Sequence, residues 1–400
     1  MDRLTPWLTI IGLGEDGPDG LSLASCTALA GAEVVAGSPR HLALLEVPAA
    51  RSLEWPVPFA SGVEQVVALR GRPVVVLASG DPFWYGVGAV LAARLQPGEW
   101  RAHPGVSCFG LAAARLGWRI EDAACLGLHA APLSRIRPHL SRGQRLIVLL
   151  RDAMAVQELA GLVTDLGFGD SPLWVMEALG GPRERLRQTR AGDPPFSDIA
   201  TPVAVAIDVQ GSGTVMPRVN GLPDRFFEHD GQITKRAVRA LTLSSLAPRP
   251  GELLWDIGAG SGSISIEWLL AHQANRAIAI EADAERGARA QRNAAALGVD
   301  RLVLQSGIAP EALVNLPHPD AVFLGGGATQ ALLETLWQRL PAGTRLVGNA
   351  VTLEAEALFA AWQAGVGGSL LRIDLADATP LGTKRGWRSA MPVVQWSVTL

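Results

Sequence analysis

The sequence predicts an α/β protein made of two different domains in tandem. Three observations support this fold class. The 400 residues exceed what one ordinary hydrophobic core accommodates. Segments typical of buried strands alternate with segments typical of helices along the whole chain. Two unrelated glycine-rich motifs, one in each half, each follow a predicted strand.

The first half contains two successive sets of strands and helices. Strands are expected where short apolar, often β-branched runs occur, and helices where apolar residues recur at helical spacing. The first set has strands at 8–12, 33–36 and 73–78, with helices at 21–32, 63–69, 87–95 and 109–116. The second set has strands at 145–150, 173–177 and 203–209, with a helix at 153–166.

A stretch rich in glycine and proline, at 210–225, interrupts this alternation and favours a domain boundary. We therefore expect domains at 1–212 and 224–400, joined by a linker at 213–223. The second domain has predicted helices at 234–246, 263–272, 284–297, 330–340 and 354–364. Its predicted strands lie at 253–257, 277–281, 302–305, 321–324, 345–349, 369–374 and 393–398.

The composition argues against several classes of protein. The net charge of −3 gives no general attraction for nucleic acid. No apolar run is long enough to span a membrane, and the N-terminal residues do not read as a signal peptide, so we expect a cytoplasmic protein. Cys26, Cys108 and Cys125 fit no metal-ligand spacing, and the histidines form no H-x-x-x-H pair, so no metal site is predicted.

The glycine turn of the second half is the most informative motif. Gly258, Gly260 and Gly262 follow the predicted strand at 253–257, and glycine lets the backbone approach a ligand closely. Ser263 stands where a dinucleotide-binding motif has its last glycine, which favours S-adenosylmethionine (SAM) over a nicotinamide cofactor. Glu281 ends the next strand about 20 residues later, where an acid can accept hydrogen bonds from ribose hydroxyls.

Other candidate ligand contacts lie at the ends of neighbouring strands in the second half. Asp256 precedes the glycine turn, and its alternative role is to stabilise that turn. Because strand ends converge on one crevice in an open parallel sheet, we also expect cofactor contacts after the third and fourth strands, at Gly307, Ile308, Ala309 and Gly325.

Two basic segments are candidates for binding substrate carboxylates. Lys235 and Arg236 follow Thr234, which alone would be an ordinary helix N-cap. Arg385 and Arg388 lie in a Gly-rich segment at 380–388, for which a solvated basic hairpin is the alternative.

These motifs carry a resemblance to a known family. The sequence DGQITK at 230–235, the run WDIGAGSGSISIEW at 255–268, the three glycines at 325–327 and the segment at 348–351 resemble the CbiT family. These are SAM-dependent methyltransferases of the corrin pathway. The resemblance covers residues 224–400 and implies a Rossmann-like class I methyltransferase fold.

A different set of motifs occupies the first half. Gly12 and Gly14 follow the first strand, Gly80 and Asp81 follow the strand at 73–78, and Ser107 precedes a helix. With a late segment that begins at Pro202, they resemble the two-lobed tetrapyrrole methylases, and within that class the CbiE family. The resemblance covers residues 5–210 and implies that these six residues contact SAM. Cys108 replaces the second serine of the family's pattern.

A CbiE-like half followed by a CbiT-like half resembles the CobL family, the decarboxylating precorrin-6B C-5,15-methyltransferases. The resemblance implies a reduced tetrapyrrole substrate, two SAM sites, two C-methylations, decarboxylation of the C-12 acetate and self-association into a homo-oligomer. No catalytic acid or base can be named from the residues. A cobalt-containing substrate, an RNA methyltransferase, a nicotinamide oxidoreductase and a binding scaffold with degenerate sites remain alternatives.

Overall fold

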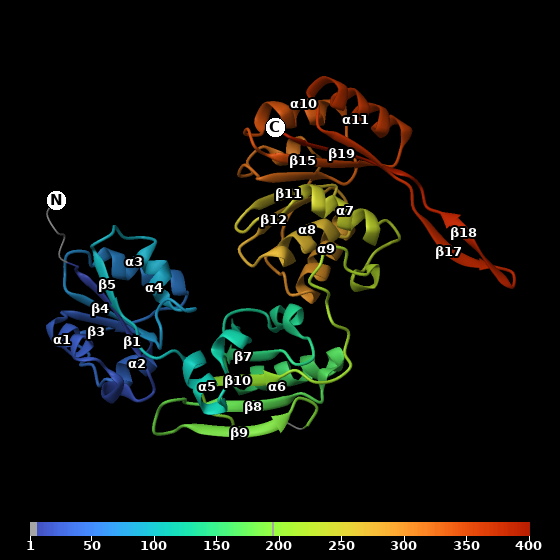
Figure 1. The fold of residues 1–400 in the computed structure, drawn as a ribbon. Coiled ribbons are helices and arrows are strands. Elements are labelled where there is room, and N and C mark those ends of the chain that lie inside the picture. The colour runs from blue at the N-terminus through green and yellow to red at the C-terminus, as the bar shows by residue number, and fades with distance from the viewer. Residues whose placement is uncertain (1–5, 194–195) are drawn as a thin grey trace. The chain divides into compact units, whose positions relative to one another are not determined.

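The computed structural model describes residues 6–193 and 196–400, which form two compact units (Figure 1). Unit 1 runs to Leu133 and continues from His139 to Thr214, whereas unit 2 comprises Ser134–Pro138 and Val215–Leu400. In the described part of the chain, no helix has the length and apolar character needed to cross a membrane.

The first lobe of unit 1 is a parallel five-stranded sheet in the order β3-β2-β4-β1-β5. Helices pack on its two faces through separate apolar clusters. The strands are β1 (Leu8–Leu13), β2 (Val34–Gly37), β3 (Ser52–Glu54), β4 (Val74–Ser79) and β5 (Trp100–His103). The helices are α1 (Leu23–Gly31), α2 (Pro39–Leu44), α3 (Phe59–Ala68) and α4 (Val87–Ala92).

The second lobe of unit 1 is a mixed sheet in the order β6-β7-β10-β8-β9, in which only β6 and β7 are parallel. The strands are β6 (Ala123–Gly127), β7 (Arg145–Leu150), β8 (Pro172–Glu177), β9 (Arg185–Arg190) and β10 (Val203–Asp208). The helices are α5 (Cys108–Leu116) and α6 (Ala153–Val163). The prediction of a two-lobed first half is therefore confirmed.

Unit 2 is a seven-stranded sheet in the order β13-β12-β11-β14-β15-β19-β16, in which only β19 is antiparallel. The strands are β11 (Leu253–Ile257), β12 (Arg276–Glu281), β13 (Val303–Ser306), β14 (Ala321–Leu324), β15 (Arg345–Ala350), β16 (Ser369–Ile373) and β19 (Val393–Thr399). The chain turns from one half of the sheet to the other between β11 and β14, which is where ligands bind in such sheets. This confirms the predicted Rossmann-like fold.

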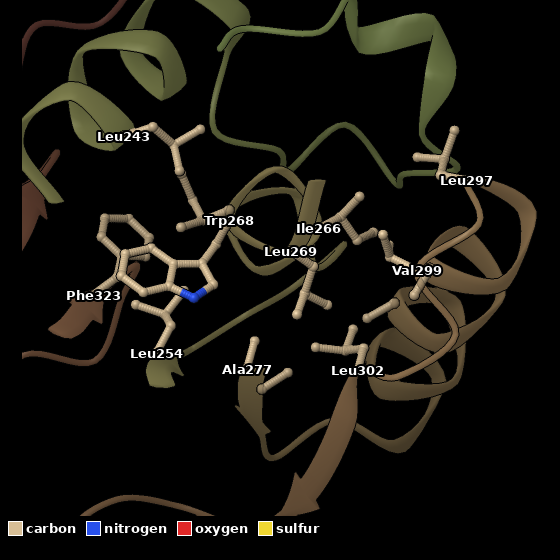
Figure 2. Packing of buried hydrophobic residues seen from close by; sticks show 14 of the residues in the cluster. Leu243, Leu254, Ile266, Trp268, Leu269, Ala277, Leu297, Val299, Leu302 and Phe323 are labelled. Atoms are coloured by element: carbon tan, nitrogen blue, oxygen red, sulfur yellow. The ribbon is translucent and has the colours of Figure 1, made fainter. Parts of the chain in front are cut away.

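Helices cover both faces of this sheet. On one face lie α7 (Arg236–Leu246), α8 (Ser263–Ala271) and α9 (Ala284–Ala296), and on the other lie α10 (Gln330–Arg339) and α11 (Leu353–Val366). Figure 2 shows Trp268 of α8 packed near Leu254 and Phe323 of the sheet and Leu243 of α7. Fully burying one apolar side chain such as Leu254 or Phe323 contributes about 1.5–3 kcal/mol to stability.

A two-stranded hairpin, β17 (Ala376–Leu381) and β18 (Lys384–Ser389), connects β16 to β19. The sequence analysis described residues 380–388 as a Gly-rich segment that could bind carboxylates, with a solvated basic hairpin as the alternative, and the structure has a hairpin. Because β16 is parallel to β11, the hairpin leaves the sheet at the same edge as the glycine turn. It extends beyond the body of the sheet (Figure 1).

A buried ion pair joins α7, α8 and the segment before them. Arg239 is fully buried, and its Nε lies 2.5 Å from Oε1 of Glu267. Glu267 also accepts hydrogen bonds from the amides of Gly221 and Leu222, at 2.6 and 2.9 Å. Arg239 donates in addition to the carbonyls of Thr234 and Leu222. The pair therefore holds this segment against the helical layer.

We expect Arg239→Met to destabilise unit 2 by about 3–5 kcal/mol, because it leaves the Glu267 carboxylate buried without its cation. Urea unfolding measures the loss. The control is Arg372→Met, whose pair with Asp374 is exposed and contributes at most about 1 kcal/mol. Equal losses in the two variants would contradict a structural role for the buried pair.

Candidate active sites

Unit 1 contains a cleft of about 690 Å³ between its two lobes. Of the residues predicted to contact SAM, Gly14, Gly80 and Pro202 line it. Gly12, Asp81 and Ser107 do not, although each is next to a lining residue in the sequence. A cleft of this volume is in the range that holds a cofactor or a drug-sized ligand.

The glycine loops of unit 1 contact one another through their backbones. The Gly80 amide donates to the Leu13 carbonyl at 2.9 Å, and the Gly105 amide donates to the Gly80 carbonyl at 3.0 Å. A Cβ at Gly12 would collide with the Gly80 carbonyl, and Gly80 has a φ of +54°. Gly12 and Gly80 are thus required by the meeting of the loops themselves.

Two predicted contact residues in these loops have local partners. Asp81 accepts from the Phe83 amide at 2.8 Å, and Ser107 caps α5 by accepting from the Gly110 amide at 3.0 Å. Cys108 follows and lines the cleft, where burial raises the pKa of its thiol to about 12. The thiol is therefore neutral and adds no charge to the cleft.

A polar cluster that the sequence analysis did not select forms one wall of the cleft. Glu15 is buried and pairs with Arg40 from the first lobe and with Arg183 from the second lobe. Arg40 also donates to the Ser79 hydroxyl at 2.8 Å and to Nε2 of His41 at 2.9 Å. These residues are far apart in the sequence, and only the glycine turn before Glu15 pointed to this region.

In unit 2 the glycine turn lies between the ends of β12 and β14. Gly258 donates to the Ile280 carbonyl at 2.9 Å, and Gly325 donates to the Ile257 carbonyl at 2.8 Å. Gly258, Gly260 and Gly262 all have positive φ, at +73°, +58° and +74°. A Cβ at Gly262 would lie 2.9 Å from the Ala290 side chain, whereas at Gly260 it would meet nothing closer than 3.9 Å. Gly260 is therefore the member of the turn with open space beside it.

Glu281 and Asp256 flank this turn but differ in their surroundings. Glu281 accepts from the amides of Gly260 and Asp283, at 2.8 and 3.0 Å, so its carboxylate lies against the turn. Asp256 is fully buried, and one of its oxygens accepts from the Ser265 amide and hydroxyl, at 3.1 and 2.7 Å. Its other oxygen, Oδ1, has no hydrogen-bond partner among the described residues. Burial raises the pKa of Asp256 to about 6, although the Ser265 bonds act in the opposite direction.

The residues after β13 are arranged around the same edge. The Gly307 amide donates to the Glu281 carbonyl at 3.0 Å, which places the 307–309 segment beside Glu281. Ile308 is 70% exposed, so its side chain offers an uncovered apolar surface there. This exposure fits a side chain available to pack on a planar ligand.

The four cations predicted to bind substrate carboxylates differ in their surroundings and contacts. Arg236 donates to the Gly221 carbonyl at 2.8 Å and so helps to hold the entry to α7, whereas Lys235 is exposed. Arg385 and Arg388 are exposed on β18, three residues apart. Because side chains alternate along a strand, they project from opposite faces of the hairpin.

No group of three or more His, Cys, Asp or Glu residues could hold a metal ion in the regions 6–193 and 196–400. In unit 2 the structure brings together the turn amides, the Glu281 carboxylate and the open position at Gly260, which were expected from the sequence to lie beside a cofactor.

We expect Asp256→Asn to stabilise unit 2 relative to the wild type at pH 8 but not near pH 4. The unfolded Asp ionises near its ordinary pKa of about 3.9, whereas the buried Asp ionises at about 6. As the pH rises through this window the native state loses stability, by roughly 2–3 kcal/mol in total. Asn carries no charge and escapes this loss.

Calorimetric unfolding of both proteins between pH 4 and pH 8 measures this difference. The pH dependence of the difference is the readout, because the Asn amide also changes the hydrogen bonding. A difference that stays constant with pH would contradict a raised Asp256 pKa.

Comparison with known proteins identifies both halves. Residues 7–195 match the tetrapyrrole (corrin/porphyrin) methylases, and residues 225–400 match the precorrin methyltransferase domain. The C-terminal domain of a precorrin-6Y C5,15-methyltransferase from Rhodobacter capsulatus has a solved structure with 54% identity and a TM-score of 0.45. The match covers 46% of this chain and all of that domain.

Two full-length relatives bear the same name, precorrin-6Y C(5,15)-methyltransferase (decarboxylating). The protein from Sinorhizobium sp. is 48% identical over 401 residues, which cover 99% of this chain and 97% of the relative. The protein from Mycobacterium tuberculosis is 42% identical over 401 residues, covering 98% and 99%. The chain therefore belongs to the family of decarboxylating precorrin-6Y C(5,15)-methyltransferases.

Proposed function

We propose that this chain methylates C-5 and C-15 of precorrin-6B and removes CO2 from its C-12 acetate, giving precorrin-8X in cobalamin biosynthesis. The names precorrin-6Y and precorrin-6B differ only in wording. The observation that supports the proposal is that each unit has its own set of glycines at the carboxyl ends of parallel strands, in a chain whose full length matches this family. The family membership favours this reaction over an RNA methyltransferase or a nicotinamide oxidoreductase.

The chemistry asks little of protein side chains beyond binding and alignment. SAM supplies an electrophilic methyl group, and the electron-rich macrocycle supplies the carbon nucleophile. Holding the two in line contributes on the order of 7–11 kcal/mol to lowering the barrier. The conjugated macrocycle also accepts the electron pair released when the acetate loses CO2. We assign C-5 methylation to unit 1, and C-15 methylation with decarboxylation to unit 2.

Each unit holds one SAM in this proposal. In unit 1 the loops at Gly14 and Gly80 and the segment at Pro202 surround the cleft. In unit 2 Glu281 would accept from the ribose hydroxyls, with Gly260 and Gly325 beside the cofactor and 307–309 near the adenine. The exposed cations Lys235, Arg385 and Arg388 would bind carboxylates of the substrate.

The proposed substrate is the metal-free macrocycle, and the proposed compartment is the cytoplasm. All three cysteines are free, which fits a reducing environment. Mass spectrometry of the product formed from metal-free precorrin-6B tests the substrate. A product seen only with the cobalt-containing form would contradict the metal-free choice.

We further propose that the chain forms a homo-oligomer through the β17–β18 hairpin. A hairpin of two strands is only marginally stable alone, and both of its edges have unpaired backbone groups. It exposes apolar side chains as well, because Leu381 and Trp387 are each more than 70% exposed. A second copy paired along one edge of the hairpin would satisfy the backbone groups of that edge and place side chains beside Leu381 on one face and beside Trp387 on the other.

We expect the full-length wild-type chain to bind two molecules of S-adenosylhomocysteine (SAH), the product of the methyl donor. The Gly260→Val variant should bind one. A side chain at this position is strained by the positive φ and enters the space left for the cofactor. Calorimetric titration gives the stoichiometry. The variant should lose C-15 methylation and decarboxylation together while keeping C-5 methylation.

Gly343→Val is the matched control, because Gly343 also has positive φ, at +91°, and open space but lies in a distant turn. It should keep two sites. Decarboxylation that is retained in Gly260→Val would contradict the assignment of this step to unit 2. A single SAH site in the wild type would contradict the proposal of one SAM per unit.

We expect Trp387→Ser combined with Leu381→Ser to lower the oligomeric state measured by light scattering. The control is Val303→Ser, on β13 at the opposite edge of the sheet and 55% exposed. A monomeric wild type, or no change in the double variant, would count against the hairpin interface.

A further inference from the structure

The polar cluster on the wall of the unit 1 cleft carries an excess positive charge. Arg40 and Arg183 are both cationic, and Glu15 is the one carboxylate that pairs with either among the described residues. His41 adds no charge near neutral pH, because burial and the neighbouring Arg40 lower its pKa to about 4. The cluster as a whole therefore has a net charge of about +1.

Arg40 is the member of this cluster that can contact a ligand. It lines the cleft, and 34% of its side chain is exposed, whereas Glu15 is only 7% exposed. Three of its guanidinium N–H groups donate to Glu15, Ser79 and His41. A guanidinium has five such groups, so two have no partner among the described residues.

The guanidinium is held in place before any ligand arrives. Ser38 caps α2 by accepting from the His41 amide at 3.3 Å, which fixes the backbone around Arg40. Ser79 and His41 then hold the same Nη2 atom. Because the long side chain is already ordered, binding an anion costs little further conformational entropy.

The rest of the cleft is mostly apolar, so a charge beside it is poorly solvated. Leu77, Met176 and Leu179 are among the lining residues, and the Cys108 thiol is neutral there. Burial and the nearby Arg183 both lower the pKa of Arg40, as expected for an incompletely balanced cation. A carboxylate at this place would be bound strongly, because charges interact more strongly where water is excluded.

We propose that the Arg40 guanidinium receives one carboxylate of a ligand in this cleft, because Glu15 is shared between Arg40 and Arg183 and neutralises only one of their two positive charges. The inference rests on the proposed function, which supplies two carboxylates of the right kind. One is the amino-acid carboxylate of the methyl donor, and the other is a side-chain carboxylate of the macrocycle. Both would form the same charge-assisted hydrogen bonds with Arg40.

The test uses the full-length chain carrying Gly260→Val, so that only the site in unit 1 binds the cofactor product. Arg40→Gln is added, and S-adenosylhomocysteine and 5′-methylthioadenosine are titrated by calorimetry. The second compound lacks the amino-acid carboxylate. If Arg40 binds the donor, the affinity for S-adenosylhomocysteine falls about 10–100-fold and that for methylthioadenosine is unchanged. If Arg40 binds the macrocycle, both affinities stay constant and the KM for C-5 methylation rises by a similar factor.

Two further variants separate ligand binding from a structural role. Glu15→Gln leaves Arg40 less neutralised, so carboxylate binding should stay the same or strengthen, whereas a merely structural cluster would be weakened by both changes. Arg72→Gln is the matched control, because Arg72 is an exposed arginine of the same lobe paired with Glu33. If Glu15→Gln does not fold, Arg40→Gln is still compared with Arg72→Gln. Weaker carboxylate binding in Arg40→Gln alone supports ligand binding by Arg40, and equal effects in the two variants contradict it.

The outcomes also separate this inference from the function on which it rests. Absence of S-adenosylhomocysteine binding in the Gly260→Val background would contradict the proposed SAM site of unit 1. Binding that is intact in that background, with affinity and KM both unchanged by Arg40→Gln, would overturn the role of Arg40 alone.

Discussion

The constraint on which both units depend is the backbone-to-backbone contact between loops at the carboxyl ends of parallel strands. In unit 1 the loop after β4 meets the end of β1 and the loop after β5, through the bonds from Gly80 to Leu13 and from Gly105 to Gly80. In unit 2 the loop after β11 meets the ends of β12 and β14, through Gly258 and Gly325. Side chains would hold these loops apart. Two unrelated folds thus use glycine for the same purpose, which is to bring strand ends close enough to share one site.

The glycines of these loops do not all have the same role. A Cβ at Gly12 or Gly325 would collide with neighbouring backbone, so these residues are needed for the loops to meet at all. Gly260 is different, because it has positive φ but open space beside it. Glycine at this position is therefore not required by a neighbouring residue, and it leaves room for a ligand beside the turn. This distinction depends on tertiary neighbours and cannot be drawn from the spacing of glycines in a sequence.

The sequence was sufficient to predict what depends on local patterns. Buried apolar runs predicted most strands of the three large sheets, and the glycine motifs marked the carboxyl ends of strands in both units. It missed β3, β5, β6 and β9. In the edge strand β9 only Leu186 is apolar and the strand buries little, so no buried apolar run marks it. It also missed the cluster of Glu15, Arg40 and Arg183, whose members come from two lobes. Arginines and glutamates are common on surfaces, so only the fold reveals that these three meet beside a cleft.

The unequal distribution of charge in unit 1 bears on how such a site selects its substrate. A reduced tetrapyrrole carries many carboxylates, yet the cleft is mostly apolar and offers a single cation, Arg40, among its lining residues. Burying several carboxylates there would cost far more than one arginine returns. For the proposed substrate we therefore expect most of the macrocycle's carboxylates to stay in water, with at most one held inside the cleft. Anchoring one point and packing a planar ring against apolar walls fixes orientation, and orientation is what a methyl transfer between preformed partners requires.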